Sequence, residues 1–395
     1  MLSKPHVRAA LEAKRESFVS LDLRQSQEVE RYRRALARLE GLGRAELEAL
    51  LAGIPRPGAL PSAERVAGQP LVRPFGRRWA NHEEARAWAR SILEGVTTLA
   101  VDGSQITPSG DFSIPVGAVQ VGRFENPHRA EGRYIKEIHF EVLPPDELEA
   151  QGAEETEGFP DLQVNLRRFE LECRALVEFM GRAVGRQPAP LCFFDGSLIL
   201  SFAAHLRPEL RGRYLRAMRG LIAASEATRV PLVGYVDNSR AQDLVSLLRW
   251  LGQETERPQL SDGDLLRSQM AWGDRSEALI CARDDRLFEG ADATLDYYGR
   301  VAFVYLKTTA ENPPARLELP RWLLEAGALE RVVDLVRAEC IVGTGYPYAL
   351  ETADAVAVLT AQDREQFYRA FQEFSAQLGL ALRYARKAYS KRGRR

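Results

Sequence analysis

The sequence predicts a mixed α/β fold in which an antiparallel group of strands is followed by parallel strands and covering helices. Three observations support this prediction. Segments rich in β-branched and apolar residues recur between turn signals at Thr97–Asp102, Phe112–Phe124 and Arg133–Val142. Strands then alternate with helical segments, which requires crossover connections and favours parallel neighbours. Finally, two strands end in the same Asp-Gly-Ser triplet.

The chain begins with a helix-forming segment. Residues 6–52 are rich in strong helix formers and carry only a narrow apolar stripe, which is typical of an arm packed against a larger body. Gly53–Pro74 is dense in proline and glycine and is interpreted as a linker. A short helix is expected to open at Asn81, where Asn81 and Glu84 can form a capping box. We therefore expect a helical arm and linker over residues 1–96.

The body of the protein is expected over residues 97–382. Turn signals at Pro108–Gly110 and Asn126–Pro127 separate the first three strands into an antiparallel meander. The elements expected after the meander are helices over Leu162–Val184, Arg207–Thr228, Arg240–Leu251, Arg321–Arg337 and Glu351–Leu382, and strands over Leu191–Asp195, Val230–Val236 and Val301–Lys307. Three antiparallel strands followed by helix, strand, helix and strand is the ribonuclease H-like order.

Composition narrows the class of protein. The 395 residues are 45% hydrophobic and 28% charged, typical of a soluble globular protein with a proper core. No run reaches the roughly 18 apolar residues of a membrane helix, and the N-terminus is charged where a signal peptide would be apolar, so we expect a cytoplasmic protein without membrane partners. The four cysteines and five histidines are scattered, which argues against a disulfide framework, a zinc cluster or a paired-histidine motif.

The two Asp-Gly-Ser triplets are Asp102-Gly103-Ser104 and Asp195-Gly196-Ser197. A single Asp-Gly is most often a turn. Two such strands side by side would place two carboxylates at one rim of a sheet, where they could bind a hard divalent cation through oxygen ligands. We therefore predict that Asp102 and Asp195 are metal ligands, with Ser104 and Ser197 supporting them and contacting nucleic acid.

Two further acids are needed for a two-metal ribonuclease H-like site. On the helix over Leu162–Val184, Glu170 and Glu172 flank the apolar stripe, and Glu172 is slightly favoured. In the late segment, Asp354 shares a helix face with apolar residues four positions away, which favours a ligand role, with Glu351 as the alternative. Tyr346 could donate its hydroxyl to a phosphate or a metal-bound water, or it could equally be a core tyrosine.

Other residues could contact a polyanion. Arg240, before a helix, and Lys307, at a strand end, could bind phosphate, although strand ends are solvated anyway. The basic tail over residues 383–395 has no acid and interleaves tyrosines with its cations, which suits phosphate neutralisation and base stacking, and it could equally be a solvated tail. The tail residues expected to bind nucleic acid are Arg383, Arg386 and Lys387.

Four motifs in order, VDGS at Val101–Ser104, FFDGSL at Phe193–Leu198, GYVDNSRA at Gly234–Ala241 and GYPYALETAD at Gly345–Asp354, resemble the NurA nuclease family. The resemblance implies a ribonuclease H-like, manganese-dependent nuclease acting on DNA ends and single strands, a homodimer, and a partnership with the hexameric ATPase HerA in the processing of double-strand breaks. It assigns catalytic roles to residues matching the family's positions, and Asp354 replaces a histidine found in archaeal members. The matching residues are Asp102, Glu172 or Glu170, Asp195, Tyr346 and Asp354.

The sequence argues against two other classes of protein and leaves one non-catalytic alternative. A haloacid-dehalogenase-type phosphotransferase would need an acid where Ser104 stands, and the sequence contains no phosphate-binding glycine loop. The remaining alternative is a non-catalytic DNA-binding or scaffold subunit on a degenerate ribonuclease H-like fold. The choice between manganese and magnesium, the polarity of digestion, the strand preference and the dependence on the ATPase also stay open.

Overall fold

The computed structural model describes residues 3–148, 160–254, 256, 258–288, 295–380 and 382. These residues form two compact units. Unit 1 comprises the described residues within the ranges 1–78, 235–285 and 297–325, and unit 2 comprises those within 79–234, 286–296 and 326–395. The domain expected over residues 97–382 therefore draws on both units, and its boundaries stay a prediction. Within the described part of the chain, no helix is both long and apolar enough to cross a membrane.

Unit 2 is built on a mixed sheet. Strand β3 (Thr98–Ile106) pairs antiparallel with β4 (Gly117–Asn126), which pairs antiparallel with β5 (Ile135–Leu143). On its other side β3 pairs parallel with β6 (Leu191–Asp195), and the first residues of β7 (Leu232–Val236) lie next to β6. The predicted change from an antiparallel meander to parallel neighbours is thus confirmed.

The expected end of the first strand was wrong. β3 continues through Asp102 to Ile106 because residues 98–106 all find partners on β4. The first Asp-Gly-Ser triplet therefore lies inside a strand, where ladder pairing overrides the turn preference of Asp-Gly. Only the second triplet follows its strand, since β6 ends at Asp195.

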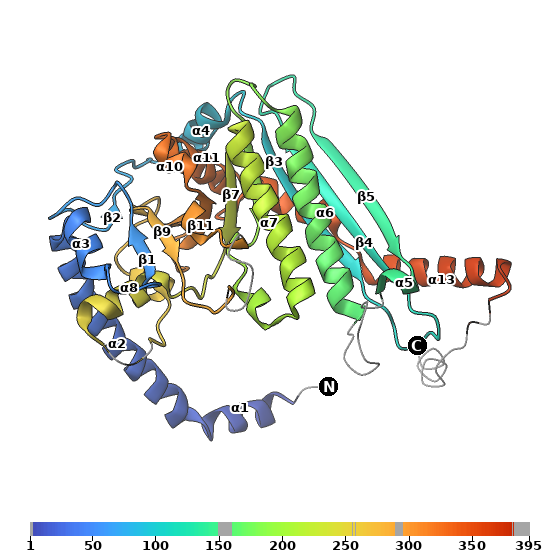
Figure 1. The fold of residues 1–395 in the computed structure, drawn as a ribbon, viewed down its shortest axis with the longest axis horizontal. Helices are drawn as coiled ribbons and strands as arrows, with labels where there is room; N and C mark the ends of the chain where they lie inside the picture. Colours follow the sequence, from blue (N-terminus) through green and yellow to red (C-terminus); the bar gives the residue numbers. More distant parts are fainter. Residues whose placement is uncertain are drawn as a thin grey trace. The chain divides into compact units, whose positions relative to one another are not determined.

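Helices cover both faces of this sheet (Figure 1). Helix α6 (Pro160–Arg182) packs against β3 and β4 and against α7 (Pro208–Thr228), while α12 (Tyr348–Ala357) packs against β3, β4 and β5. The predicted apolar stripe of α6 is confirmed, because Phe169, Cys173 and Leu176 are all buried. The remaining helices of unit 2 are α4 (His82–Leu93), α5 (Pro145–Leu148), α11 (Leu329–Val342), α13 (Ala361–Gln377) and the short 3₁₀ helix η1 (Ser201–His205).

Unit 1 begins with the predicted helical segment, broken at two points into α1 (Lys4–Glu12), α2 (Arg15–Gly41) and α3 (Arg44–Leu51). Helix α2 packs on α8 (Asp243–Gly252), and its narrow stripe is buried there, with Tyr32, Leu36 and Leu39 each at most 2% exposed. The later part of α2 is therefore part of the hydrophobic core of unit 1, whereas α1 has no buried residue and the first apolar residues of α2 are exposed.

The segment expected as a linker, Gly53–Pro74, contains strands. β1 (Gly58–Pro61) pairs with β9 (Leu279–Ala282), and β2 (Val72–Arg73) pairs with β8 (Arg275–Ser276). β1 has one strand neighbour, and an edge strand tolerates a proline such as Pro61. The proline and glycine content of Gly53–Pro74 favoured a linker, and the pairing could not be predicted because the partner strands are more than 200 residues away in the sequence.

The sheet of unit 1 has the order β1, β9, β10 (Val301–Leu306) and β11 (Ala315–Pro320). Every residue of β10 and β11 is buried. The expected helix over Arg321–Arg337 is split into α10 (Trp322–Glu325) and α11. Short elements that the sequence did not indicate are β8, β9, β11, α9 (Asp262–Leu266) and the 3₁₀ helix η3 (Tyr298–Arg300).

A buried ion cluster lies in this unit. The guanidinium of Arg316, 1% exposed, is 2.8 Å from Asp243 Oδ2 and 2.6 Å from Glu318 Oε1. It also lies over the ring of Phe303, 3.7 Å from the centroid, and its Nη1 donates to the hydroxyl oxygen of Tyr305. Arg283 also pairs with Asp243, with 2.5 Å between its Nη2 and Asp243 Oδ2. Arg316 therefore pairs with Glu318 and shares Asp243 with Arg283, and removing one partner from a buried ion cluster is costly.

Replacing Arg316 by alanine should destabilise the protein by about 3–5 kcal/mol, because Glu318 would lose a buried cation and Asp243 would keep only Arg283. The matched control is Arg321→Ala, which removes an exposed pair with Glu325 and should cost about 0–1 kcal/mol. Thermal melting of both variants tests this expectation. Equal melting temperatures for the two variants would show that the buried cluster does not stabilise unit 1.

Candidate functional site

Asp102 and Asp195 come from adjacent parallel strands of unit 2. The paired residues of β3 and β6 end with Val101 opposite Phe194, so the two aspartates occupy the next position on each strand. Asp195 ends β6 and is exposed, whereas Asp102 is partly buried within β3. The two triplets that the sequence singled out therefore meet at one edge of the sheet.

The alternation of side chains along β3 sorts its residues between the two helix layers. A Cβ at Gly103 would point into α6, 2.6 Å from Arg168 Cγ, so Gly103 faces α6. Asp102 and Ser104 then face the opposite layer, which holds α12. In agreement, Ser104 Oγ accepts a hydrogen bond from the backbone N–H of Leu359, just beyond α12, at 3.3 Å.

Glu172 reaches the site from α6 through the space at Gly103. A Cβ at Gly103 would lie 2.4 Å from Glu172 Oε1, far inside van der Waals contact. Glu172 is 6% exposed, and among the described residues its Oε1 has no hydrogen-bond donor. The absence of a side chain at Gly103 therefore allows a buried carboxylate from one helix layer to approach Asp102.

Arg168 lies beside this carboxylate, one helical turn earlier. Its Nη1 donates to the carbonyl oxygen of Gly103 at 2.9 Å and lies 3.6 Å from Glu172 Oε1. The Arg168 charge also opposes the rise in the pKa values of Asp102 and Asp195. Sequence reasoning missed this residue, although its four-residue spacing to Glu172 on a helix is a signal for an ion pair.

Tyr346 and Asp354 approach from the segment around α12. The hydroxyl of Tyr346 donates to Asp195 Oδ1 at 3.0 Å. Asp354 is exposed, and its charge raises the pKa values of both Asp102 and Asp195. Its expected direction toward apolar neighbours was wrong, because Val358 is itself 48% exposed.

The carboxyl groups are held where ionisation is disfavoured. Burial, together with the charges of Asp195 and Asp354, raises the pKa of Asp102 to about 6. Burial, together with the charges of Asp102 and Asp195, raises the pKa of Glu172 to about 8. Although Asp195 is exposed as a whole residue, partial desolvation of its carboxyl group and then the charge of Asp354 raise its pKa. The cluster thus has more negative charge than Arg168 compensates.

The residues present fit a divalent cation by their chemistry. All candidate donors are carboxylate oxygens, the ligands that hard cations prefer, and Glu172 Oε1 is a buried acceptor with no donor in the described part of the chain. As they stand, no three His, Cys, Asp or Glu side chains among the described residues are grouped closely enough to hold a metal ion. In the described part of the chain, the carboxylates are close enough to influence one another's charge but not close enough to coordinate one ion together.

Glu170, the alternative to Glu172, lies in a different environment. Both of its carboxylate oxygens accept from the guanidinium of Arg213 on α7, at 2.9 and 2.7 Å. Arg167 adds a further ion pair at 3.7 Å. The structure thus brings Glu172 to Asp102 and pairs Glu170 with arginines.

The residues expected to contact nucleic acid are dispersed. Ser197 Oγ donates to the carbonyl of Ile199 and accepts from its N–H, which closes a local turn. Arg240 is exposed in unit 1. Lys307 was expected at a solvated strand end, but it is 3% exposed and its ammonium donates to the carbonyls of Arg267 and Asn312. Arg383, Arg386 and Lys387 lie outside the described residues.

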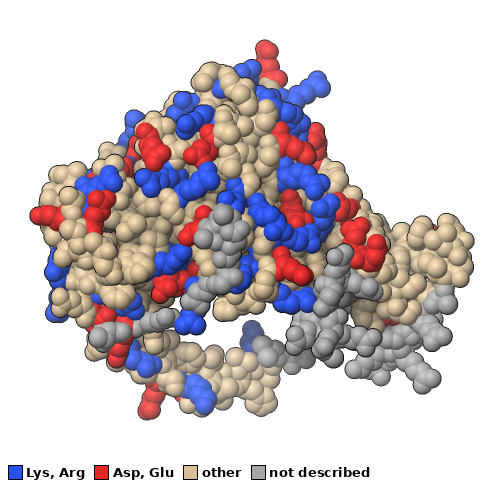
Figure 2. All heavy atoms as spheres, viewed as in Figure 1, with Lys and Arg blue, Asp and Glu red and all other residues tan. Residues whose placement is uncertain are grey.

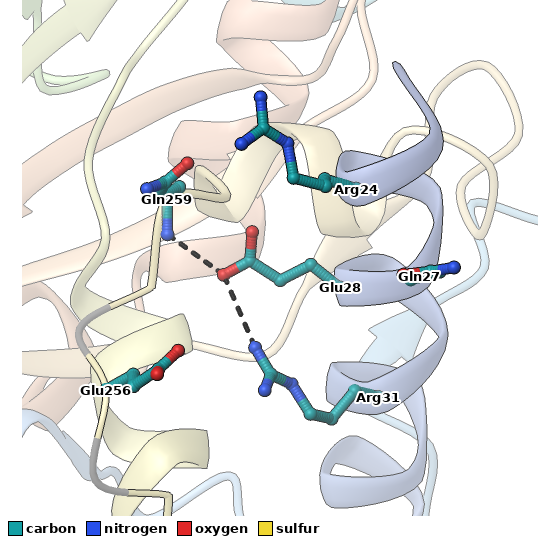
Figure 3. Close-up of a pocket in the computed structure, with 6 residues that line it drawn as sticks. All are labelled: Arg24, Gln27, Glu28, Arg31, Glu256 and Gln259. Carbon is teal, nitrogen blue, oxygen red and sulfur yellow. Dashed lines mark hydrogen bonds and ion pairs between the residues drawn. The ribbon is translucent and has the colours of Figure 1, made fainter. Parts of the chain in front are cut away.

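Unit 1 has a separate pocket of about 340 Å³ (Figure 3). Its lining residues are Arg24, Gln27, Glu28, Arg31, Glu256 and Gln259. Glu28 Oε1 accepts from the backbone N–H of Gln259 at 2.9 Å and lies 3.8 Å from Arg31. The lining contains two arginines and two glutamates, and Glu28 already has partners within it. The pocket therefore shows no preference for a ligand of one charge.

Comparison with known proteins gives one clear match. The family model described as the NurA domain matches residues 96–359. No curated protein matches the chain. Among solved structures, NurA with manganese is 10% identical and covers 72% of this chain and 90% of its own, with a TM-score of 0.42. The catalytic domain of human endonuclease V is 15% identical and covers 76% of this chain and 95% of its own, with a TM-score of 0.32.

Replacing Gly103 by alanine should push Glu172 and Arg168 away from β3 and destabilise the protein by about 1–3 kcal/mol, because the added Cβ overlaps both side chains. The matched control is Gly181→Ala on α6, where nothing lies within 4 Å and alanine should stabilise the helix by up to about 1 kcal/mol. Chemical denaturation measures both effects. If Gly103→Ala is as stable as Gly181→Ala, the close approach of α6 to β3 is incorrect.

Proposed function

The chain belongs to the NurA family, and we propose that it is a divalent-metal-dependent deoxyribonuclease that uses manganese, with magnesium as the alternative ion. One observation carries the proposal. Neighbouring carboxylate charges help burial to raise the pKa values of three carboxyl groups of unit 2: Asp195 and Asp354 act on Asp102, Asp102 and Asp195 act on Glu172, and Asp354 acts on Asp195. Such a cluster is unfavourable by itself and suits cation-dependent hydrolysis.

The ligands we propose are Asp102, Asp195, Glu172 and Asp354. A bound divalent cation would activate the attacking water and stabilise the leaving oxygen of a phosphodiester. Tyr346 orients the carboxylate of Asp195 through its hydroxyl. Arg168 holds the strand carbonyl at Gly103 and lies beside Glu172, so it positions that carboxylate at the edge of the sheet.

The protonation of Glu172 is part of this proposal. With its pKa raised to about 8, the isolated carboxyl group keeps its proton at neutral pH. A cation bound there would replace that proton, because metal ligands must be deprotonated. Burial of Glu172 would therefore couple proton release to cation binding.

Family membership also supports the proposed biological setting. We propose that the protein processes DNA ends and single strands in double-strand break repair, as a homodimer and together with a HerA-type hexameric ATPase. Arg240 and the tail residues Arg383, Arg386 and Lys387 stay predicted contacts with DNA phosphates. The alternative is a non-catalytic DNA-binding or scaffold subunit, which would bind DNA without cleaving it.

Asp102→Asn and Asp195→Asn should each lower manganese-dependent degradation of linear DNA by at least about 100-fold, because removing a ligand charge weakens cation-assisted hydrolysis by several kcal/mol. The measurement is nucleotide release with manganese and with EDTA. Glu178→Gln, on the exposed face of α6, is the control and should retain activity. Undiminished degradation by both aspartate variants would refute the assignment, and an inactive wild-type protein, tested with its ATPase, would favour the binding subunit.

Glu172→Gln and Glu170→Gln distinguish the two candidate helix ligands. We expect Glu172→Gln to weaken manganese binding by about 10–100-fold, whereas Glu170→Gln should leave it nearly unchanged, because the carboxylate of Glu170 is paired with Arg213. Isothermal titration calorimetry of both variants measures the affinity directly. The reverse order of the two affinities would make Glu170 the ligand.

A further inference from the structure

A row of aromatic rings leads from the carboxylate edge to the surface of unit 2. Phe194, next to Asp195, contacts Phe169 with ring centroids 5.8 Å apart. Phe169 contacts Tyr214 at 4.9 Å, and Tyr214 contacts Phe202 at 5.2 Å, edge to face. Phe194, Phe169 and Tyr214 are at most 7% exposed, but Phe202 is 53% exposed. The row therefore ends in a ring that is supported from below and open to solvent.

Cations accompany the exposed ring. Residues 207–219, at the start of α7, contain five arginines and a single acid, Glu209. Arg213 pairs with Glu170, whereas among the described residues no acid pairs with Arg207 or Arg211. In Figure 2, Lys and Arg side chains gather over α6 and α7, interspersed with acids. The beginning of α7 thus offers uncompensated positive charge close in sequence to Phe202.

The chain connection places these residues at the catalytic edge. β6 ends at Asp195, η1 carries Phe202 directly after it, and α7 starts at Pro208. A helix that follows a strand begins at the strand's carboxyl end, where ligands bind in α/β sheets. Arg182, at the end of α6, precedes β6 and belongs to the opposite edge.

We propose that Phe202, Arg207 and Arg211 form a holding surface for single-stranded DNA beside the carboxylate cluster, with a base stacked on Phe202 and backbone phosphates on the two arginines. Aromatic rings next to cations are the usual means of holding a single strand without reading its sequence. Uncompensated arginines complement a polyanion. A duplex keeps its bases stacked within the helix and cannot use the ring, so the surface favours unpaired strands. This inference rests on the proposed nuclease function and names the substrate form that the site would hold.

The test measures binding of a labelled single-stranded oligonucleotide to the full chain by fluorescence anisotropy, in EDTA to prevent cleavage. Phe202→Ala should weaken binding by at least about fivefold, because stacking on one aromatic ring contributes about 1–3 kcal/mol. Phe202→Tyr keeps the ring and should bind within about twofold of wild type, whereas Phe202→Leu keeps apolar volume only and should resemble Phe202→Ala. Binding of a blunt duplex should change little in all three variants.

The arginines are tested by salt dependence. The double variant Arg207→Ala, Arg211→Ala should flatten the slope of log K against log salt by about 1.4, since each phosphate contact of a single strand contributes about 0.7. Arg182→Ala, at the opposite edge, is the matched control and should leave the slope unchanged.

Three results would overturn the proposal. Unchanged binding of the single strand by Phe202→Ala would show that the ring does not contact DNA. Wild-type affinity of Phe202→Leu would exclude stacking of a base on the ring. A change in molecular mass of Phe202→Ala by light scattering would make Phe202 a contact between copies of the chain. Nuclease assays of the same proteins separate the two proposals. An active wild type with normal binding by Phe202→Ala refutes only the surface, whereas an inactive wild type with the expected binding series refutes only the nuclease.

Discussion

The candidate site depends on one close approach, that of α6 to β3 at Gly103. A strand normally separates the side chains of its two faces, and here Asp102 lies on the face of β3 toward α12 whereas Glu172 comes from α6 on the other face. They approach each other because the intervening residue has no side chain, which leaves room for Glu172 Oε1 where a Cβ would otherwise lie. The other participants then need only reach the open end of β6, where Tyr346 holds Asp195.

This approach has an electrostatic cost that shapes the rest of the site. Bringing carboxylates together while burying them raises their pKa values, and Arg168 is the charge that opposes this rise at Asp102, Asp195 and Glu172 alike. One guanidinium cannot neutralise the whole set. The site therefore keeps more negative charge than Arg168 compensates, which is the electrostatic basis of the proposal that a divalent cation binds there.

The sequence predicted those parts of the site that depend on local pattern. Hydrophobic runs located β3 and β6, and the helical stripe located α6, so the amino-acid pattern alone was enough to pair the two aspartates. The choice between Glu170 and Glu172 depended on what faces each one, namely Arg213 and Asp102, and tertiary neighbours cannot be read from periodicity. The strands within Gly53–Pro74 were hidden for the same reason, because pairing with distant residues overrides local turn propensity.

The two Asp-Gly-Ser triplets lie side by side on β3 and after β6, although their glycines have different roles. Gly103 lies in an extended strand and is required by the close approach of α6. Gly196 has a φ of +128°, a conformation that side chains rarely adopt, and it turns the chain directly after Asp195. The serines differ as well, since Ser104 is joined to the segment after α12 and Ser197 closes its own turn. In both triplets a carboxylate is held beside a glycine. Gly103 is required by the packing of α6 against β3, whereas Gly196 is required by the backbone conformation of the turn.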